Sequence, residues 1–95
     1  MRYELQFVAP ALKEWHRLGA TLKARFKKKL ADRLDQPHVP GDRLRDATSR
    51  YKIKLRASGH RLVYEVLDDL LIVEVIALGK RDRGAVHGQA ANRTS

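Results

Sequence analysis

The chain has 95 residues, and its 20 lysines and arginines against 11 aspartates and glutamates give a formal net charge of +9 at pH 7. Such an excess of positive charge favours a polyanionic partner, nucleic acid above all. The absence of cysteine excludes disulfides and thiolate metal sites. We expect one domain over residues 1–95. No apolar run is long enough for a signal peptide or a membrane span, which favours a cytoplasmic protein without a membrane partner.

A strand and two helices are predicted in the N-terminal half. Apolar residues alternate with polar ones over residues 3–8, which is typical of a strand. Pro10 suits the first turn of a following helix, whose predicted buried stripe is Leu12, Trp15 and Leu18. Thr21 is the predicted cap of a second helix. This helix repeats an apolar residue every four positions, at Leu22, Phe26, Leu30 and Leu34.

Three strands in close succession are predicted in the C-terminal half. Residues 51–56 turn at Ser58 and Gly59 into a strand over 60–67, and Asp68 and Asp69 turn that strand into another over 70–78. Short turns indicate an antiparallel meander. The last strand is apolar at nearly every position, so we expect it to be central or covered on both faces, and to end at Gly79. From about residue 84 we expect a weakly structured tail with at most a short helix.

These elements predict an α+β fold in the order βααβββ, with two helices packed on one face of a small, mainly antiparallel sheet. The opposite face is predicted to be cationic. Lys52, Lys54 and Arg56 alternate with Tyr51, Ile53 and Leu55, and no acidic residue lies between positions 50 and 61. Like charges fixed side by side repel one another, so a polyanion is the expected occupant of this face.

The sequence resembles the RelE toxins of bacterial toxin–antitoxin pairs, within the wider RelE/ParE group. The residues that carry the resemblance are 11–15, 18–19, 27–30, 44–45, 51–56, 58–59, 61–64 and 79–81. The resemblance implies a ribosome-dependent endoribonuclease that cleaves messenger RNA in the decoding site of the 70S ribosome. It also implies a cognate antitoxin that neutralises the toxin, and operator DNA as a partner only through the toxin–antitoxin complex.

The resemblance also implies catalytic cations. Cleavage by the 2′-hydroxyl needs a base, charge stabilisation at the phosphate and an acid for the leaving oxygen. Neighbouring positive charges make an ammonium group easier to deprotonate, so a lysine in a cluster can exchange protons near pH 7. The expected catalytic residues are Lys52, Lys54, Arg61, Arg81 and His87. The residues expected to bind RNA or the ribosome are Arg45, Arg56, Lys27, Lys28, Lys80 and Arg83.

The proposed base departs from the family. Relatives of this pattern carry a tyrosine six residues after the arginine that ends Gly-Lys-Arg, and here that position is His87. Histidine has a reference pKa of about 6.5 against about 10 for tyrosine and accepts a proton more readily. A lysine remains the alternative base. His16 and His38 are predicted to be surface residues. Cleavage is expected to need no metal or other cofactor, since lysines and arginines can supply the positive charge.

Two other functions stay open. A ParE-like toxin of the same fold would inhibit DNA gyrase, but such a toxin has no need of the Lys52, Lys54, Arg61 and Arg81 cluster. A non-catalytic nucleic-acid-binding module is compatible with the charge alone.

Overall fold

The computed structural model describes residues 2–45 and 48–80. Its elements in chain order are β1 (Glu4–Phe7), α1 (Ala9–His16), α2 (Ala20–Asp35), the short 3-10 helix η1 (Pro40–Asp42), β2 (Arg50–Leu55), β3 (His60–Leu67), a second 3-10 helix η2 (Asp68–Leu70) and β4 (Ile72–Lys80). The predicted βααβββ order is confirmed. The predicted tail from about residue 84 lies outside the described residues.

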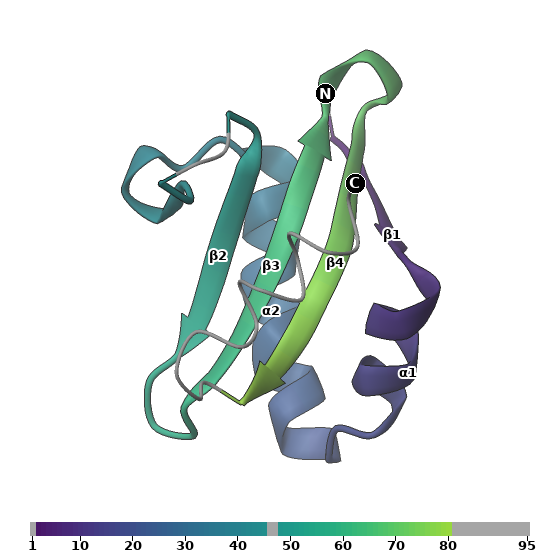
Figure 1. Cartoon of the computed structure of the whole chain (residues 1–95), viewed down its shortest axis with the longest axis vertical. Helices are drawn as coiled ribbons and strands as arrows, with labels where there is room; N and C mark the ends of the chain where they lie inside the picture. Colours follow the sequence, from purple (N-terminus) through teal and green to yellow (C-terminus); the bar gives the residue numbers. More distant parts are fainter. Residues whose placement is uncertain (1, 46–47, 81–95) are drawn as a thin grey trace.

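The four strands form one sheet in the order β1-β4-β3-β2 (Figure 1). β3 pairs antiparallel with both β2 and β4, while β1 pairs parallel with β4. The sheet is therefore mainly antiparallel, as predicted. β4 lies between β1 and β3, and its residues Val73, Val75, Ile76, Ala77 and Leu78 are all buried. Its central place explains the nearly unbroken apolar run.

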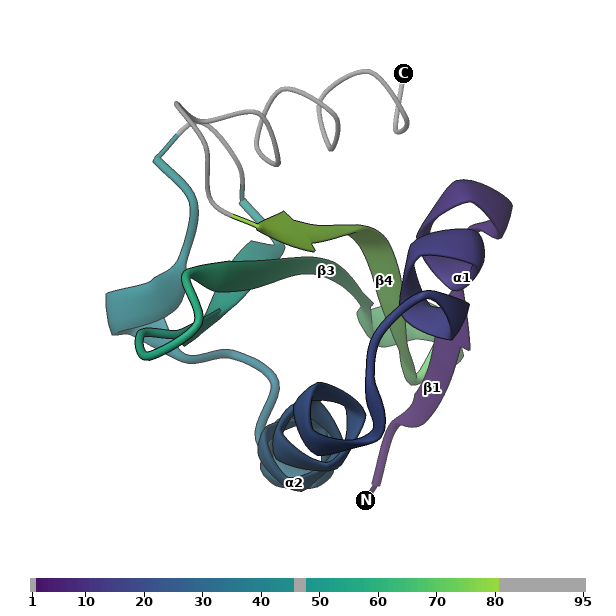
Figure 2. The same cartoon turned by 90° about the horizontal axis from the view of Figure 1, so that it is seen from below.

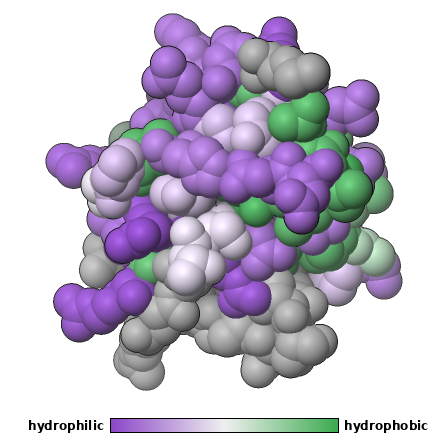
Figure 3. Space-filling view, turned by 90° about the horizontal axis from the view of Figure 1, so that it is seen from above, coloured by the Kyte–Doolittle hydropathy of each residue, from purple (hydrophilic) through white to green (hydrophobic). Residues whose placement is uncertain are grey.

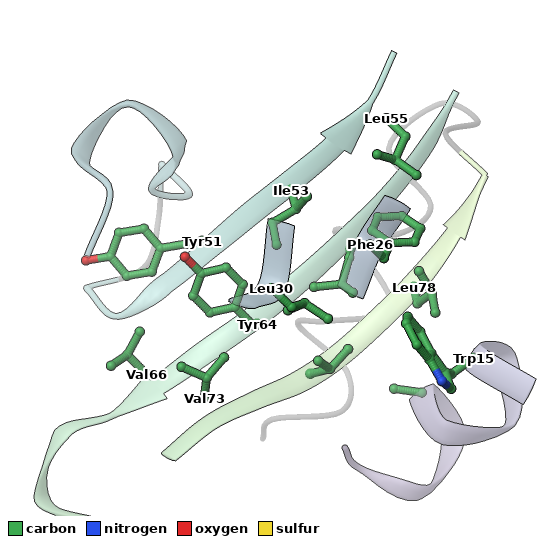
Figure 4. Packing of buried hydrophobic residues seen from close by; sticks show 13 residues of the cluster. Trp15, Phe26, Leu30, Tyr51, Ile53, Leu55, Tyr64, Val66, Val73 and Leu78 are labelled. Atoms are coloured by element: carbon green, nitrogen blue, oxygen red, sulfur yellow. The ribbon is translucent and has the colours of Figure 1, made fainter. Parts of the chain in front are cut away.

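The two helices contribute to the same core but meet the sheet at different places. α2 lies across one face, and α1 lies beside β4 and β1 at one edge (Figure 2). Phe26 and Leu30 of α2 are buried, and Trp15 of α1 packs near Phe26 with ring centroids 6.4 Å apart. Tyr51 and Tyr64 stack at the other end of this core (Figure 4). The predicted α+β arrangement is confirmed.

The predicted stripe of α1 is wrong at Leu12, which is 39% exposed, whereas Ala11 is fully buried. Trp15 is fixed in the core by Phe7, 5.3 Å away between ring centroids, and by α2. The residue one helical turn before Trp15 is Ala11, so Leu12 is rotated away from the core. The buried residue that precedes Trp15 on α1 is therefore four positions earlier, at Ala11, and not three positions earlier, at Leu12.

Several predicted boundaries also differ. The last strand begins at Ile72 and not at residue 70, because residues 68–70 form η2. α2 begins at Ala20 with Gly19 as its N-cap, and the Gly19 carbonyl accepts the backbone hydrogen bond of Lys23 at 3.1 Å. Thr21 is therefore already helical. β4 does not end at Gly79 but runs on to Lys80, because these two residues pair with Arg61 and His60 of β3. Pairing with a neighbouring strand outweighs the weak strand preference of glycine.

The end of the molecule at which β3 passes into β4 is mostly hydrophilic on its surface, with hydrophobic atoms gathered on the side of β1 and α1 (Figure 3). No helix in the described part of the chain is long and apolar enough to cross a membrane.

Candidate active site

Lys52, Lys54 and Arg61 share one face of the β2–β3 ladder. On β2 the residues that alternate with the two lysines are buried in the core shared with α2: Tyr51, Ile53 and Leu55. On β3 the residue after Arg61 is Leu62, which lies in the same core. The lysines and Arg61 therefore lie on the face opposite α2, and each is half-buried. We call this set of three residues the cationic cluster.

The register of β2 and β3 brings Lys54 and Arg61 directly opposite each other, as Cα partners. The turn after β2 sets this register. Gly59 adopts a positive φ of 74°, and its N–H donates to the carbonyl of Leu55 at 2.9 Å. Only glycine takes this conformation without strain. Because successive strand residues face opposite sides, a slip of one residue would move Arg61 to the α2 face.

The face opposite α2 is not cationic throughout, contrary to the prediction. Its middle is an apolar group, formed by Val63, Ile76 and Ala77, with each residue at 0% exposure. Beyond that group, Glu65 and Glu74 are Cα partners across β3 and β4. Arg50 donates from Nε to Oε1 of Glu65 at 3.1 Å. The cationic cluster is thus confined to the end of the ladder next to the β2–β3 turn.

A hollow of about 320 Å³ lies beside Lys54 and Arg61 at this turn, and Arg56, Gly59 and His60 also line it. Arg56 is exposed. Among the residues that the structure describes, the buried Nδ1 atom of His60 has no hydrogen-bond partner. Lysine and arginine donors around a hollow of this kind can hold a phosphate, because the arginine fork matches phosphate oxygens and the ammonium supplies a point charge.

Arg45 lies at the rim of the same face. The preceding residue, Leu44, packs against the apolar group that contains Val63, and its N–H donates to the carbonyl of Arg50 at 2.9 Å. Val63 is the Cα partner of Lys52. Leu44 therefore fixes the backbone next to Arg45 on the side of the cationic cluster, and Arg45 itself is exposed.

The loop before Arg45 is fixed by an ion pair that the sequence did not predict. Arg33 of α2 donates from Nη2 to Oδ2 of Asp42 at 2.6 Å, and from Nη1 to the Tyr64 hydroxyl at 2.8 Å and the Lys52 carbonyl at 3.3 Å. The Tyr64 hydroxyl donates to the carbonyl of Pro37 at 2.7 Å. One arginine thus connects α2, the loop and the backbone of Lys52.

Burial and hydrogen bonding act in opposite directions on the pKa values of Arg33 and Tyr64. Burial lowers the pKa of Arg33, but the Tyr64 hydrogen bond and the Asp42 ion pair outweigh it and raise the pKa. Burial raises the pKa of Tyr64, although Arg33 opposes this. Both side chains therefore stay protonated over the physiological range, and their geometry does not change with pH there.

His38 is exposed, as predicted, but it is bonded on both ring nitrogens. Nδ1 lies 2.9 Å from the Tyr51 hydroxyl, and Nε2 lies 2.8 Å from Oδ1 of Asp68. The Tyr3 hydroxyl donates to the same Asp68 oxygen at 2.6 Å. Hydrogen bonds from Tyr3 and His38 lower the pKa of Asp68. This chain of contacts joins the loop that holds His38 to β2, η2 and the residue before β1, and no local sequence pattern indicates it. His16, by contrast, is a surface residue at the end of α1, as predicted.

The remaining predicted residues separate into three groups. Lys28 and Arg56 line a second hollow between α2 and β2. Lys27 is exposed on α2, and Lys80 is exposed at the end of β4, where it pairs with His60. Arg81, Arg83 and His87 lie outside the described residues. Within residues 2–45 and 48–80, no group of three or more His, Asp or Glu side chains could hold a metal ion.

Comparisons with known proteins place the chain in a family. A family model described as ParE toxin of type II toxin-antitoxin system, parDE, matches residues 5–84. A curated relative, mRNA interferase toxin RelE of Escherichia coli strain K12, is 47% identical over 93 residues, which cover 98% of each chain. The solved free-state structure of an R81A/R83A mutant of E. coli toxin RelE superposes with a TM-score of 0.92, at 44% identity over the full length of both chains.

The same mutant toxin has also been solved with a peptide of the antitoxin RelBc, and that toxin chain is 46% identical to this one, with a TM-score of 0.83 and 95% of each chain covered. The fold, the cationic cluster and these matches define a toxin of a type II toxin–antitoxin system. The chain belongs to the ParE/RelE toxin family.

Proposed function

We propose that the chain is an mRNA interferase: an endoribonuclease toxin that cleaves messenger RNA on the 70S ribosome and so inhibits translation. The observation that carries this proposal is the register that sets Lys54 opposite Arg61, with Lys52 on the same face. Relatives named as mRNA interferases at 47% identity over nearly the whole chain support the same activity. A cytoplasmic location follows from a ribosomal substrate.

The reaction uses the substrate's own nucleophile. The 2′-hydroxyl oxygen attacks the adjacent phosphorus, the bond from phosphorus to the 5′ oxygen breaks, and a 2′,3′-cyclic phosphate and a 5′-hydroxyl remain. A base takes the 2′-hydroxyl proton, and an acid gives a proton to the leaving oxygen. Negative charge grows on the phosphate oxygens during attack, and fixed donors aimed at it stabilise the transition state.

Each member of the cationic cluster has a role in this proposal. Arg61 holds the phosphate oxygens through two donors, because its guanidinium is planar and permanently charged. Lys54, directly opposite, stabilises the charge that develops on the same phosphate. Lys52 lies two residues further from the turn on the same face and supplies a proton donor or a further positive charge. Arg81 and His87 complete the proposed catalytic set, with His87 or a lysine as the base.

A gyrase inhibitor of the same fold is the alternative function, since the matching family model carries the ParE description. The cationic cluster favours RNA cleavage, because the geometry that phosphate chemistry needs has no role in blocking gyrase. A non-catalytic binding module would likewise have no need of three cations fixed at one end of a ladder.

The test is cleavage of messenger on programmed 70S ribosomes by the purified protein, with mapping of the cut and of its end groups. Wild type should give cyclic phosphate ends, and the Lys52→Ala/Lys54→Ala double variant should give none while keeping its fold. Inhibition of gyrase supercoiling without messenger cleavage would overturn the proposal. A double variant that cleaves at the wild-type rate would show that the cluster is not the site.

We also propose that a cognate antitoxin neutralises this chain, as the peptide complex of the E. coli mutant toxin suggests. Operator DNA would then be reached only through that complex. Co-expression with the product of the neighbouring gene should restore growth and yield a stable complex. If no such product binds, the antitoxin part of the proposal fails, while the nuclease part is unaffected.

A further inference from the structure

A second cationic hollow lies between α2 and the outer edge of β2. Its volume is about 710 Å³. α2 contributes Arg25, Lys28, Lys29 and Asp32 to its lining, and β2 with the following turn contributes Lys54 and Arg56. We call this hollow the α2–β2 groove. Cations outnumber the single carboxylate in it by a wide margin.

The periodicity of α2 gathers these cations on one side. Positions three and four apart share a helix face, and Arg25, Lys28, Lys29 and Asp32 follow this spacing. The adjacent stripe, which includes Phe26 and Leu30, is buried against the sheet. The charged side therefore flanks the buried stripe and stands over the edge of β2. The helix holds its cations in a row without an ion pair to Asp32 among the described residues.

The edge of β2 is already covered, so the groove does not invite an added strand. Lys29 Nζ donates to the carbonyl of Lys54 at 3.3 Å, and Arg33 Nη1 donates to the carbonyl of Lys52 at 3.3 Å. These contacts occupy the backbone acceptors that a peptide strand would use. The groove therefore presents positive charge to a ligand, and not a strand edge for backbone pairing. This favours phosphate groups over an extended peptide.

The α2–β2 groove is continuous with the candidate active site. Lys54, Leu55 and Arg56 line both this groove and the smaller hollow that also contains Arg61. A line of cations therefore passes from the cationic cluster around the end of β2 to α2. Arg25, Lys28 and Arg56 are exposed, and within residues 2–45 and 48–80 none of them has a hydrogen-bond or ion-pair partner. Their charges face solvent at the groove.

We propose that the α2–β2 groove binds the phosphodiester backbone of an RNA strand, as an anchoring site next to the cleavage site. The assignment deepens the proposed function, on which its choice of RNA as the polyanion rests. The strand can belong to the messenger that enters the cleavage site or to the ribosomal RNA beside it, since both present the same backbone. Binding here raises affinity without taking part in bond breaking.

The test compares Arg25→Gln/Lys28→Gln with the control Lys13→Gln/Arg17→Gln, which makes the same chemical changes at exposed positions on and just after α1. Affinity is measured against salt concentration for two probes: 70S ribosomes without messenger, and a short single-stranded RNA. Single-strand phosphate contacts contribute about 0.7 each to the slope of log affinity against log salt. The groove variant should lose about 1.4 in slope, and the control nothing.

Between 50 and 200 mM salt, that difference means that wild type loses about sevenfold more affinity than the groove variant. A loss confined to vacant ribosomes assigns the strand to ribosomal RNA, and a loss with the short RNA assigns it to the messenger. The toxin concentration that gives half of the maximal single-turnover cleavage rate should rise for the groove variant and not for the control. If the double variant does not fold, Arg25→Gln alone should lower the slope by about 0.7 instead.

Equal slopes for the groove variant and the control with both probes would overturn the proposal. So would unchanged RNA binding with weaker binding of the cognate antitoxin, because the groove would then serve an acidic protein segment. The failure of the proposed function is a separate result. If wild type does not cleave messenger but the groove variant still loses RNA affinity, the groove stands and the nuclease assignment falls.

Discussion

Lys54 and Arg61 are Cα partners across β2 and β3, on the face turned away from α2. Directly opposite residues on one face of an antiparallel ladder have Cβ atoms about 4.5–5.5 Å apart, and like charges at that distance repel each other. The fold nevertheless holds them there, with Gly59 at the turn fixing the register. A phosphate bound between the two side chains, as proposed, would lower this repulsion.

Substitutions of Arg61 test the proposed role of the Lys54–Arg61 pair in cleavage most directly. Arg61→Gln removes the charge and should lower the single-turnover cleavage rate by about 10²–10³-fold, as for the loss of a preorganised donor. Arg61→Lys keeps the charge but loses the two-donor fork, and its rate should fall between the two. Thermal midpoints should stay near wild type, since the residue is half-buried and faces away from the core. A glutamine variant with wild-type rate would remove Arg61 from the mechanism.

Periodicity in the sequence was enough to predict the elements, the mainly antiparallel sheet, the central place of the last strand and the cationic pattern of β2. Periodicity failed where contacts with neighbouring elements decide which residue is buried or where a strand ends. Leu12 and Ala11 both fit a helical stripe, and only the packing of Trp15 between Phe7 and Phe26 selects Ala11. Gly79 looks like a strand end until its pairing with Arg61 is known.

The candidate active site was likewise predictable from the sequence only in part. The strand pattern put Lys52 and Lys54 on one face, but whether Arg61 joins them depends on register, which the pattern left open. The contacts of Arg33 with Asp42 and Tyr64 join segments 9 and 31 residues apart, and no local motif indicates them. Likewise, Glu65 and Glu74 become neighbours only through the pairing of β3 with β4.

The Arg33–Asp42 pair should contribute measurably to stability. The side chains are 15% and 32% exposed, and the contact is 2.6 Å. Asp42→Asn leaves Arg33 without its carboxylate, and we expect a loss of about 2 kcal/mol in the free energy of unfolding, within the range for hydrogen bonds to charged groups. Urea denaturation measures it.

The matched control for that variant is Arg2→Gln. Arg2 and Asp35 also form an ion pair, at 3.7 Å, but their side chains are 60% and 66% exposed. Exposed pairs contribute under about 1 kcal/mol. Equal losses for the two variants would mean that the Arg33–Asp42 pair does not stabilise the loop beyond ordinary surface charge.

Asp68 should make stability depend on acid pH. Its pKa is lowered by the hydrogen bonds of Tyr3 and His38, so the folded protein holds this carboxylate ionised to lower pH than the unfolded chain does. The stabilisation is present above the unfolded pKa of about 3.9 and is lost as pH falls through the folded pKa. Asp68→Asn should therefore be less stable than wild type at pH 7, and the gap should narrow as pH falls below about 3.9. A gap independent of pH would show that the Tyr3 and His38 bonds do not depend on the charge.

Chelation should leave cleavage intact. The proposed mechanism takes its positive charge from lysine and arginine side chains, Lys52, Lys54 and Arg61 among them, and none of its steps uses a metal. The measurement is single-turnover cleavage on pre-assembled ribosomes, with excess chelator and the magnesium that the ribosome itself requires kept constant. Activity that disappears with chelator and returns only with zinc or manganese would contradict the prediction.

His87 is one of two proposed bases for the 2′-hydroxyl proton, and a lysine is the other. If His87 is the base, it must be neutral to act, so the single-turnover rate should fall as pH drops below about 6.5, the reference pKa of histidine. His87→Ala should slow the chemical step by about 10²–10⁴-fold while binding changes little. His87→Tyr restores the residue of the RelE pattern and should keep substantial activity. If a lysine is the base instead, the alanine variant retains nearly the wild-type rate and the wild-type pH profile, and the Lys52→Ala and Lys54→Ala single variants identify which lysine takes the proton.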